Sequence, residues 1–168
     1  MRFDQDSATC HVLTFKEGLL SPMAHDLRLR VTRFSIEVAE QIVARFDAAS
    51  LVVETPMKDG APNPSALGAA DKLKIAGQIR DDVLHGERYP EITFRSSAMQ
   101  QRADGGYDLR GELSLHGVTR AIEASTSLVA GRQHLSLVLH QPDFGIAPYR
   151  ALLGTLKIRA DVRVELAV

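Results

Sequence analysis

Two adjacent polar residues, His25 and Asp26, are the pair in this chain whose types best suit chemistry. An imidazole beside a carboxylate is typical of a metal site or of an acid–base couple. Adjacent residues on a β-strand point to opposite faces, so these two side chains cannot act together on one substrate without a turn. The alternative is that the pair begins a strand and that Asp26 accepts hydrogen bonds from nearby backbone N–H groups. The sequence favours this structural interpretation.

Other reactive residues carry weaker signals. His85 follows Asp81-Asp82 near the end of a predicted helix, where the helix dipole favours a cation, and Cys10 has no obvious activating base. HExxH, CxxC and GxSxG motifs are absent from the sequence. We therefore predict a non-enzymatic protein without catalytic residues, metal ligands or cofactor. A small metal-dependent enzyme that uses His25 remains the alternative from another class.

The composition of the chain argues against nucleic-acid binding and against a membrane span. The chain has 168 residues, a net charge of -1 and no Trp, so neither charge nor stacking aromatics indicate nucleic-acid binding. No apolar run approaches the roughly 18 residues that a membrane span requires. The lone Cys10 and an N-terminus unlike a secretory signal lead us to expect a cytoplasmic protein. The length predicts one domain over residues 1–168.

The clearest structural signal is the segment GELSLHGVTR, residues 111–120. A two-residue turn at His116-Gly117 requires positive φ at both positions, which glycine adopts freely and histidine more readily than most residues. The resulting β-hairpin has one apolar and one polar face, and Arg120 is the only charge on the apolar face. The predicted register pairs Leu115 with Val118, Leu113 with Arg120, Gly111 with Ile122 and Arg110 with Glu123.

Alternation with a period of two predicts further strands along most of the chain. From Leu156 to Val168 apolar residues alternate with charged ones, as in a half-buried antiparallel strand. The alternation that includes Leu27 and Leu29 shifts phase before Phe34, which predicts a β-bulge near positions 32–33. Another strand is predicted over 42–54, with a phase change after position 48.

Residues 65–84 differ, because their apolar positions recur every three or four residues and predict a helix. Ser65 is the expected N-cap, and Gly77 leaves either one helix or two shorter ones. About eight long strands and one helical insertion between the third and fourth strands predict a mainly β fold, either a barrel or a sandwich. Strands of ten residues or more favour an eight-stranded antiparallel barrel, which can be filled by its side chains or hold one slender ligand.

Three segments resemble the YceI-like family: GLLSPMAHDLRLRVTRFSIEV (18–38), IRDDVLHGERYPEITFRSS (79–97), and GELSLHGVTRAIE (111–123) together with DFGI (143–146). The Ala24-His25-Asp26-Leu27 stretch resembles a subgroup without a signal peptide. The resemblance spans nearly the whole chain. It implies a lipocalin-like eight-stranded barrel closed by a helix, with an apolar tunnel for a polyisoprenoid, fatty acid or related long-chain lipid.

The residues expected on the inward faces are candidates for lining such a tunnel, although alternation alone fits a packed core equally well. We predict as ligand-binding residues Phe15, Leu27, Leu29, Phe34, Phe94, Leu113, Leu115, Ile158 and Val162. Arg120 is added because its guanidinium, at a barrel end, either extends into water or contacts a polar headgroup. A structural or interaction module with a filled barrel, including a homodimer through a barrel edge or the helix, is the third hypothesis.

Overall fold

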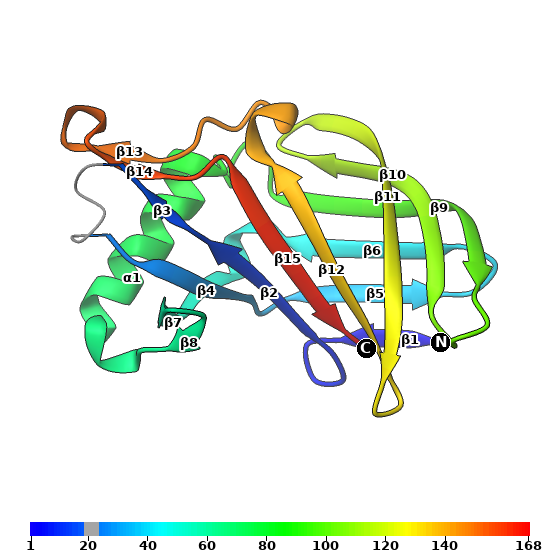
Figure 1. The fold of residues 1–168 in the computed structure, drawn as a ribbon. Helices are drawn as coiled ribbons and strands as arrows, with labels where there is room; N and C mark the ends of the chain where they lie inside the picture. The colour runs from blue at the N-terminus through cyan, green and yellow to red at the C-terminus, as the bar shows by residue number, and fades with distance from the viewer. Residues whose placement is uncertain (19–23) are drawn as a thin grey trace.

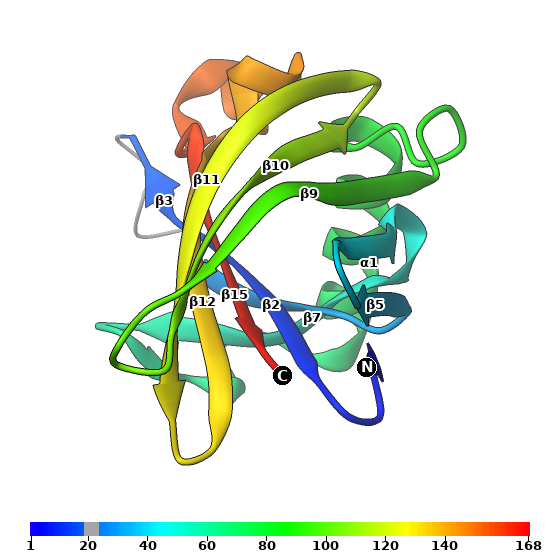
Figure 2. The same ribbon diagram turned by 90° about the vertical axis from the view of Figure 1, so that its right-hand side faces the viewer.

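The computed structural model describes residues 1–18 and 24–168. It is mainly β: a curled antiparallel sheet with one α-helix at its side (Figure 1, Figure 2). The main sheet has twelve strands in the order β1-β5-β6-β9-β10-β11-β12-β15-β2-β4-β7-β8, and a second sheet has the order β13-β14-β3. The strands are β1 (Arg2–Asp4), β2 (Thr9–Thr14), β3 (Lys16–Glu17), β4 (Asp26–Val31), β5 (Phe34–Val38), β6 (Ile42–Asp47), β7 (Leu51–Lys58), β8 (Ala61–Pro62), β9 (Glu91–Gln101), β10 (Tyr107–Leu115), β11 (Val118–Val129), β12 (Arg132–His140), β13 (Arg150–Ala151), β14 (Leu156–Ile158) and β15 (Asp161–Ala167).

The predicted count of eight strands and the predicted position of the helix are not confirmed. One reason is that two long expected strands are each divided by a bend. β4 ends before Thr32 and β5 begins at Phe34, and the 3-10 turn η2 (Ala48–Ser50) separates β6 from β7. Hydrogen bonds join the two bends to each other. The carbonyl of Ser50, in the second bend, accepts from the backbone N–H and the hydroxyl of Thr32, in the first. The phase changes in the sequence mark these two corners.

The β10–β11 hairpin has the predicted register. Leu115 pairs with Val118 and Leu113 pairs with Arg120. The turn residues His116 and Gly117 have φ values of 54° and 76°, as a two-residue turn of this kind requires. On the outer face, Nε of Arg110 lies 2.9 Å from Oε1 of Glu123. The hairpin therefore buries the face that its alternation indicates.

The helical segment is divided into three parts. The 3-10 turn η3 (Pro64–Ala66) is followed by α1 (Ala69–Gln78) and by one π-helical turn, η4 (Ile79–Val83). The expected N-cap was wrong: Gly68 holds that position, and the Ser65 hydroxyl donates to Oδ1 of Asn63. Gly77 lies inside α1. Ile75 of α1 and Ile79 of η4, on either side of the change in helical pitch after Gln78, pack against the same apolar cluster.

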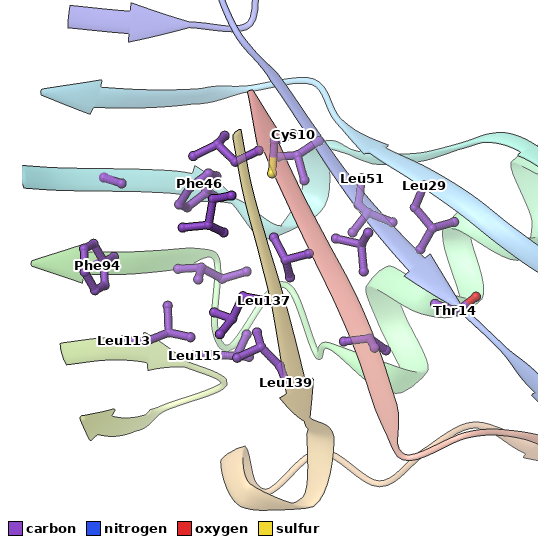
Figure 3. Close-up of a pocket in the computed structure, with 18 of the residues that line it drawn as sticks. Cys10, Thr14, Leu29, Phe46, Leu51, Phe94, Leu113, Leu115, Leu137 and Leu139 are labelled. Atoms are coloured by element: carbon purple, nitrogen blue, oxygen red, sulfur yellow. The ribbon is translucent and has the colours of Figure 1, made fainter. Parts of the chain in front are cut away.

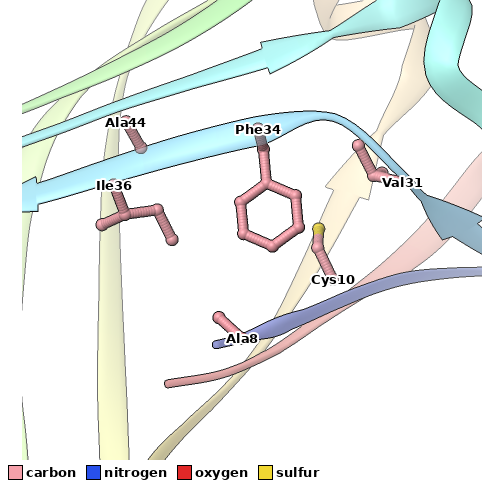
Figure 4. Close-up of a cluster of buried hydrophobic side chains, with 6 residues drawn as sticks. All are labelled: Ala8, Cys10, Val31, Phe34, Ile36 and Ala44. Carbon is pink, nitrogen blue, oxygen red and sulfur yellow. The ribbon is translucent and has the colours of Figure 1, made fainter. Parts of the chain in front are cut away.

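One cluster of buried side chains lies where β4 passes into β5. Phe34 is buried there against Cys10 and Ile36, and its ring stacks on Phe46 with a centroid separation of 5.7 Å (Figure 4). Among residues 1–18 and 24–168, no helix has the length and apolar character needed to cross a membrane.

Candidate functional site

Inward-facing side chains of the curled sheet enclose a cavity of about 1150 Å³. In Figure 3, Leu29, Phe94, Leu113 and Leu137 point into it from β4, β9, β10 and β12. Because side chains alternate along each strand, the neighbours of these residues lie on the outer face. The volume exceeds the roughly 300–1,000 Å³ of common small-molecule sites. The interior is therefore hollow rather than filled.

One wall of the cavity is helical. Leu67 and the apolar side of α1 and η4 cover the sheet next to β4 and β7, where Ile75 and Ile79 pack around Leu29 and Val53. On the polar side, Nζ of Lys72 donates to the carbonyl of Glu54 at 3.0 Å. The lining residues of this wall are Leu67, Asp71, Lys74, Ile75, Gln78, Ile79, Val83 and Leu84.

Among the described residues, the cavity lining includes three charged side chains, those of Asp71, Lys74 and Arg132. Asp71 and Lys74 belong to α1, and Arg132 is the first residue of β12, whose start lies well away from that helix (Figure 1, Figure 2). Between them the lining is almost entirely apolar. Gln78 and Tyr149 are two of the few polar groups there, and Nε2 of Gln78 donates to the Tyr149 hydroxyl at 3.5 Å. Such a lining excludes charged ligand groups from the middle of the cavity.

Most of the predicted site residues line this cavity. They are Leu27, Leu29, Phe94, Leu113, Leu115, Ile158 and Val162. The structure brings them together from β4, β9, β10, β14 and β15. Their role in binding a ligand stays a prediction, because their position shows only that they form the wall.

Three predicted residues lie elsewhere. Phe15 was placed on the wrong face: the inward residues of β2 are Cys10, Val12 and Thr14, and Phe15 packs under the Arg163 guanidinium, 5.8 Å from its ring centroid. It lines a separate small hollow with Lys16, Glu17, Gly18, Asp26 and Arg159. Phe34 does point inward, but it fills the packed corner rather than the cavity.

Arg120 is the third. It is exposed, and its Nη1 donates to the backbone carbonyl of Asp143 at 3.1 Å. The register with Leu113 is as predicted, but the long side chain leaves the apolar face to reach a carbonyl of η5 (Gln141–Phe144). The exposure agrees with the expected extension into water, whereas the bond to the Asp143 carbonyl was not predicted.

His25 and Asp26 point to opposite sides, as the strand geometry predicts. His25 lines the cavity, whereas Oδ1 of Asp26 accepts the backbone N–H of Lys16 at 2.8 Å on the other side. The two side chains therefore do not form an acid–base couple. In the described residues no group of three or more His, Cys, Asp or Glu could hold a metal ion.

Cys10 also lines the cavity. Its side chain is buried, and this burial raises the pKa of the thiol to about 12. The thiol is therefore protonated at neutral pH and is a poor nucleophile. The geometry of the lining supports enclosure of an apolar molecule.

The sequence did not assign several lining residues to the site. Leu135, Leu137 and Leu139 alternate on β12 and form part of the wall, and their pattern was visible as a strand. The helical residues were harder to assign, because an amphipathic helix packs equally well on a filled core. Tyr149 lies outside strands and helices and carries no periodic signal at all.

The family model of the YceI-like domain matches residues 7–168. No curated protein sequence matches the chain. Among solved structures, the fold is similar to that of Burkholderia cenocepacia BcnA, with a TM-score of 0.70 and 15% identity over 98% of this chain and 96% of that one.

Two other solved structures share the fold. A polyisoprenoid binding domain from Saccharophagus degradans, implicated in plant cell wall breakdown, has a TM-score of 0.61 and 16% identity, covering 95% of this chain and 91% of its own. The Campylobacter jejuni YCEI protein has a TM-score of 0.57 and 14% identity, covering 86% and 84%. At these identities the likeness concerns the fold.

Proposed function

Since the chain belongs to the YceI-like family, whose model matches residues 7–168, we propose that its cavity binds one long apolar molecule, such as a polyisoprenoid or a fatty chain. The observation that carries the proposal is the hollow interior of about 1150 Å³, whose middle section is almost entirely apolar. Transfer of an alkyl or isoprenoid chain from water into such a wall is favourable by about 25 cal/mol per Å² of buried apolar surface. The role is binding rather than catalysis.

The composition of the lining supports a ligand with its polar end beside α1. Asp71 and Lys74 on α1 are exposed, while Leu113, Leu115 and Leu137 belong to the apolar part of the lining. A polar headgroup buried in the middle would lose its hydrogen bonds to water without gaining others. The headgroup therefore stays at the end where water and charged side chains are available.

Native mass spectrometry of freshly purified protein, followed by organic extraction, tests the proposal. We expect an added mass that is released into the organic phase and identified as a long-chain lipid. Reconstitution of delipidated protein with geranylgeraniol supplies a second measurement. If neither the purified nor the reconstituted protein carries a lipid, the proposed function is wrong.

Two neighbouring residues on β12 provide a matched pair of variants. Leu137 lines the cavity and Val138 is 57% exposed on the opposite face. Leu137→Trp places an indole in the cavity and is expected to reduce lipid binding, whereas Val138→Trp adds the same group outside and leaves binding unchanged. Equal effects of the two variants would show that the lipid binds elsewhere.

Two further parts of the proposal concern the setting. We propose a cytoplasmic protein, on the basis of the single cysteine, and fractionation of the source cells tests this.

A homodimer also stays a prediction, and light scattering at several protein concentrations tests it.

A further inference from the structure

The imidazole rings of His85 and His116 meet although 31 residues separate them in the chain. Nδ1 of His85 lies 2.9 Å from Nε2 of His116, and Nδ1 of His116 lies 3.3 Å from the carbonyl oxygen of Phe144. Both histidines have positive φ, 47° and 54°, which few residues other than glycine adopt without strain. The contact thus joins three separate segments: the loop after η4, the β10–β11 turn and η5.

The hydrogen bonds determine where the protons lie. The Phe144 carbonyl can only accept, so Nδ1 of His116 carries a proton and donates to it. In the neutral ring, Nε2 of His116 then has a lone pair, and His85 must donate its Nδ1 proton to it. A proton added to His85 at its other nitrogen leaves this bond intact. A proton added to His116 places two N–H groups face to face and breaks it.

The ring geometry distinguishes this hydrogen bond from a metal site. The ring centroids are 5.2 Å apart, close to the largest separation that two imidazoles can have when their nitrogens are 2.9 Å apart. The two rings are therefore nearly collinear, and each nitrogen is directed at the other. In a chelate both lone pairs would point at a common third position. The arrangement suits a shared proton.

The pair lies directly beside the cavity wall. Leu84 and Leu115, which precede the two histidines in the chain, both line the cavity. Phe144 is buried in the apolar cluster with Val83 and Leu113. The His85–His116 bond therefore attaches the end of the helical wall to the turn of the hairpin, at the opposite end of that wall from the Lys72–Glu54 contact.

The surroundings of the pair oppose a second proton. Besides the two histidines, the charged and titratable residues of the segments that meet here are Arg80, Asp81, Asp82, Glu87, Arg88, Tyr89, Arg120 and Asp143. Burial lowers the pKa of His116 most; the Phe144 carbonyl raises it, and the charges of His85 and Arg88 lower it. The Tyr89 ring packs on His116 at 4.4 Å between centroids. The fold thus favours neutral His116.

We propose that the His85–His116 pair is a proton-operated latch on the helical wall, which opens in acid and speeds the release of the bound ligand. The proposal rests on the proposed function for its second part only. Because the fold favours the neutral ring, the attachment is complete above the ordinary histidine pKa of about 6.5 and is lost as the pH falls below it. If the barrier to ligand release falls by the net contribution of one hydrogen bond, the bound ligand dissociates about fivefold faster.

The variant His85→Asn tests the latch. Asparagine tolerates positive φ, and its amide can turn to offer N–H to neutral His116 or C=O to protonated His116. The bond then persists at both pH values. His134→Asn is the matched control, because His134 is exposed on β12 and its ring does not belong to the pair.

Two measurements keep the latch and the proposed function separate. The first is hydrogen exchange of residues 79–89 in the ligand-free protein, corrected for intrinsic rates, at about pH 7.5 and about pH 5.5. We expect the wild type and His134→Asn to lose protection in acid and His85→Asn to retain it. Equal loss in all three proteins would overturn the latch.

The second measurement is the dissociation rate of N-phenyl-1-naphthylamine, an apolar fluorophore that stays uncharged over this pH range. We expect acid to accelerate its release about fivefold from the wild type and His134→Asn, and to leave the rate from His85→Asn unchanged. Equal acceleration in His85→Asn would also contradict the latch. If no variant binds the probe at neutral pH, the lipid analysis and reconstitution described above decide the proposed function, and the exchange experiment alone decides the latch.

Discussion

The ring of Phe94 on β9 lies directly against the bare backbone of Gly111 on β10. A Cβ atom at Gly111 would lie 2.6 Å from Cε2 of Phe94 and 2.4 Å from the carbonyl oxygen of Arg95. The β9–β10 register shifts between Arg110 and Gly111, at the same place. The glycine therefore lets the two strands approach closely enough for Phe94 to form part of the cavity wall.

Replacement of this glycine tests the contact. Gly111→Ala should lower the free energy of unfolding by about 1–3 kcal/mol, because the backbone of Arg95 cannot move aside without distorting the ladder. Gly77→Ala is the control, since its Cβ would find only ordinary contact, 3.8 Å from Nη2 of Arg80, and alanine favours the helix. Urea denaturation measures both. A Gly111→Ala protein as stable as the wild type would refute the close approach.

A second prediction concerns Glu54 on the outer face. Its Oε2 accepts from Nε of Arg28 at 2.5 Å and lies 3.3 Å from Nε2 of His11. Burial raises the pKa of Glu54, but the Arg28 hydrogen bond and the charges of His11 and Arg28 outweigh it and lower the pKa overall. The stabilisation is therefore complete above the ordinary pKa of about 4.3 and is lost as the pH falls toward the lowered value.

Glu54→Gln is accordingly expected to cost about 1 kcal/mol at neutral pH and progressively less below about pH 4. Glu112→Gln, an exposed position on β10, is the control and should have little effect. Stability curves at several pH values measure the difference. A constant difference across that range would mean that the carboxylate charge contributes nothing.

The third prediction concerns Cys10. With a thiol pKa of about 12 and 3% exposure, it should react with a thiol reagent only when the protein unfolds. At about pH 8 only about one thiol in ten thousand is ionised. Labelling in buffer is compared with labelling in concentrated urea. Rapid labelling of the native protein would mean that solvent reaches the wall near β2.

The fourth prediction separates Arg120 from its cross-strand partner Leu113. Arg120→Ala removes an exposed contact to the Asp143 carbonyl and should change stability by no more than about 0.5 kcal/mol, with lipid capacity unchanged. Leu113→Ala enlarges the cavity at a buried wall position and should cost about 2–4 kcal/mol. Lipid loading and melting curves compare the two. Loss of lipid in Arg120→Ala would restore its headgroup role.

Local pattern predicted much of the fold. The hairpin register followed from the His116-Gly117 turn and the alternation, because both are properties of neighbouring residues. The phase changes near Thr32 and Ala48 were visible in the sequence, but the first was predicted as a β-bulge, whereas in the structure one strand ends and another begins there. The strand count did not follow, because a phase change does not distinguish a bulge within one strand from a bend or a 3-10 turn between two strands.

The site was less accessible from the sequence. Leucines on alternating positions form the same pattern around a cavity as in a filled core, so the hollow depends on how far apart the walls stand. Phe15 was misplaced because the strand's phase there is set by pairing with β15, where Arg163 faces Leu13. The His85–His116 contact joins two turns across the fold, which no local periodicity reports.

The bends at the two corners have a consequence for association. At these corners the chain passes from β4 into β5 and from β6 into β7, and so crosses between two parts of the main sheet. The terminal strands of that sheet are short: β1 has three residues, and β8 has two and ends at Pro62. β8 pairs only with Met57 and Lys58 of β7, and α1 covers the rest of that strand, where Nζ of Lys72 donates to the carbonyl of Glu54. Short terminal strands, one of them with a proline, and this helical cover leave little unpaired backbone for another chain to extend. Strand addition is thus a poor route to self-association, and a dimer of this protein would have to form through side chains.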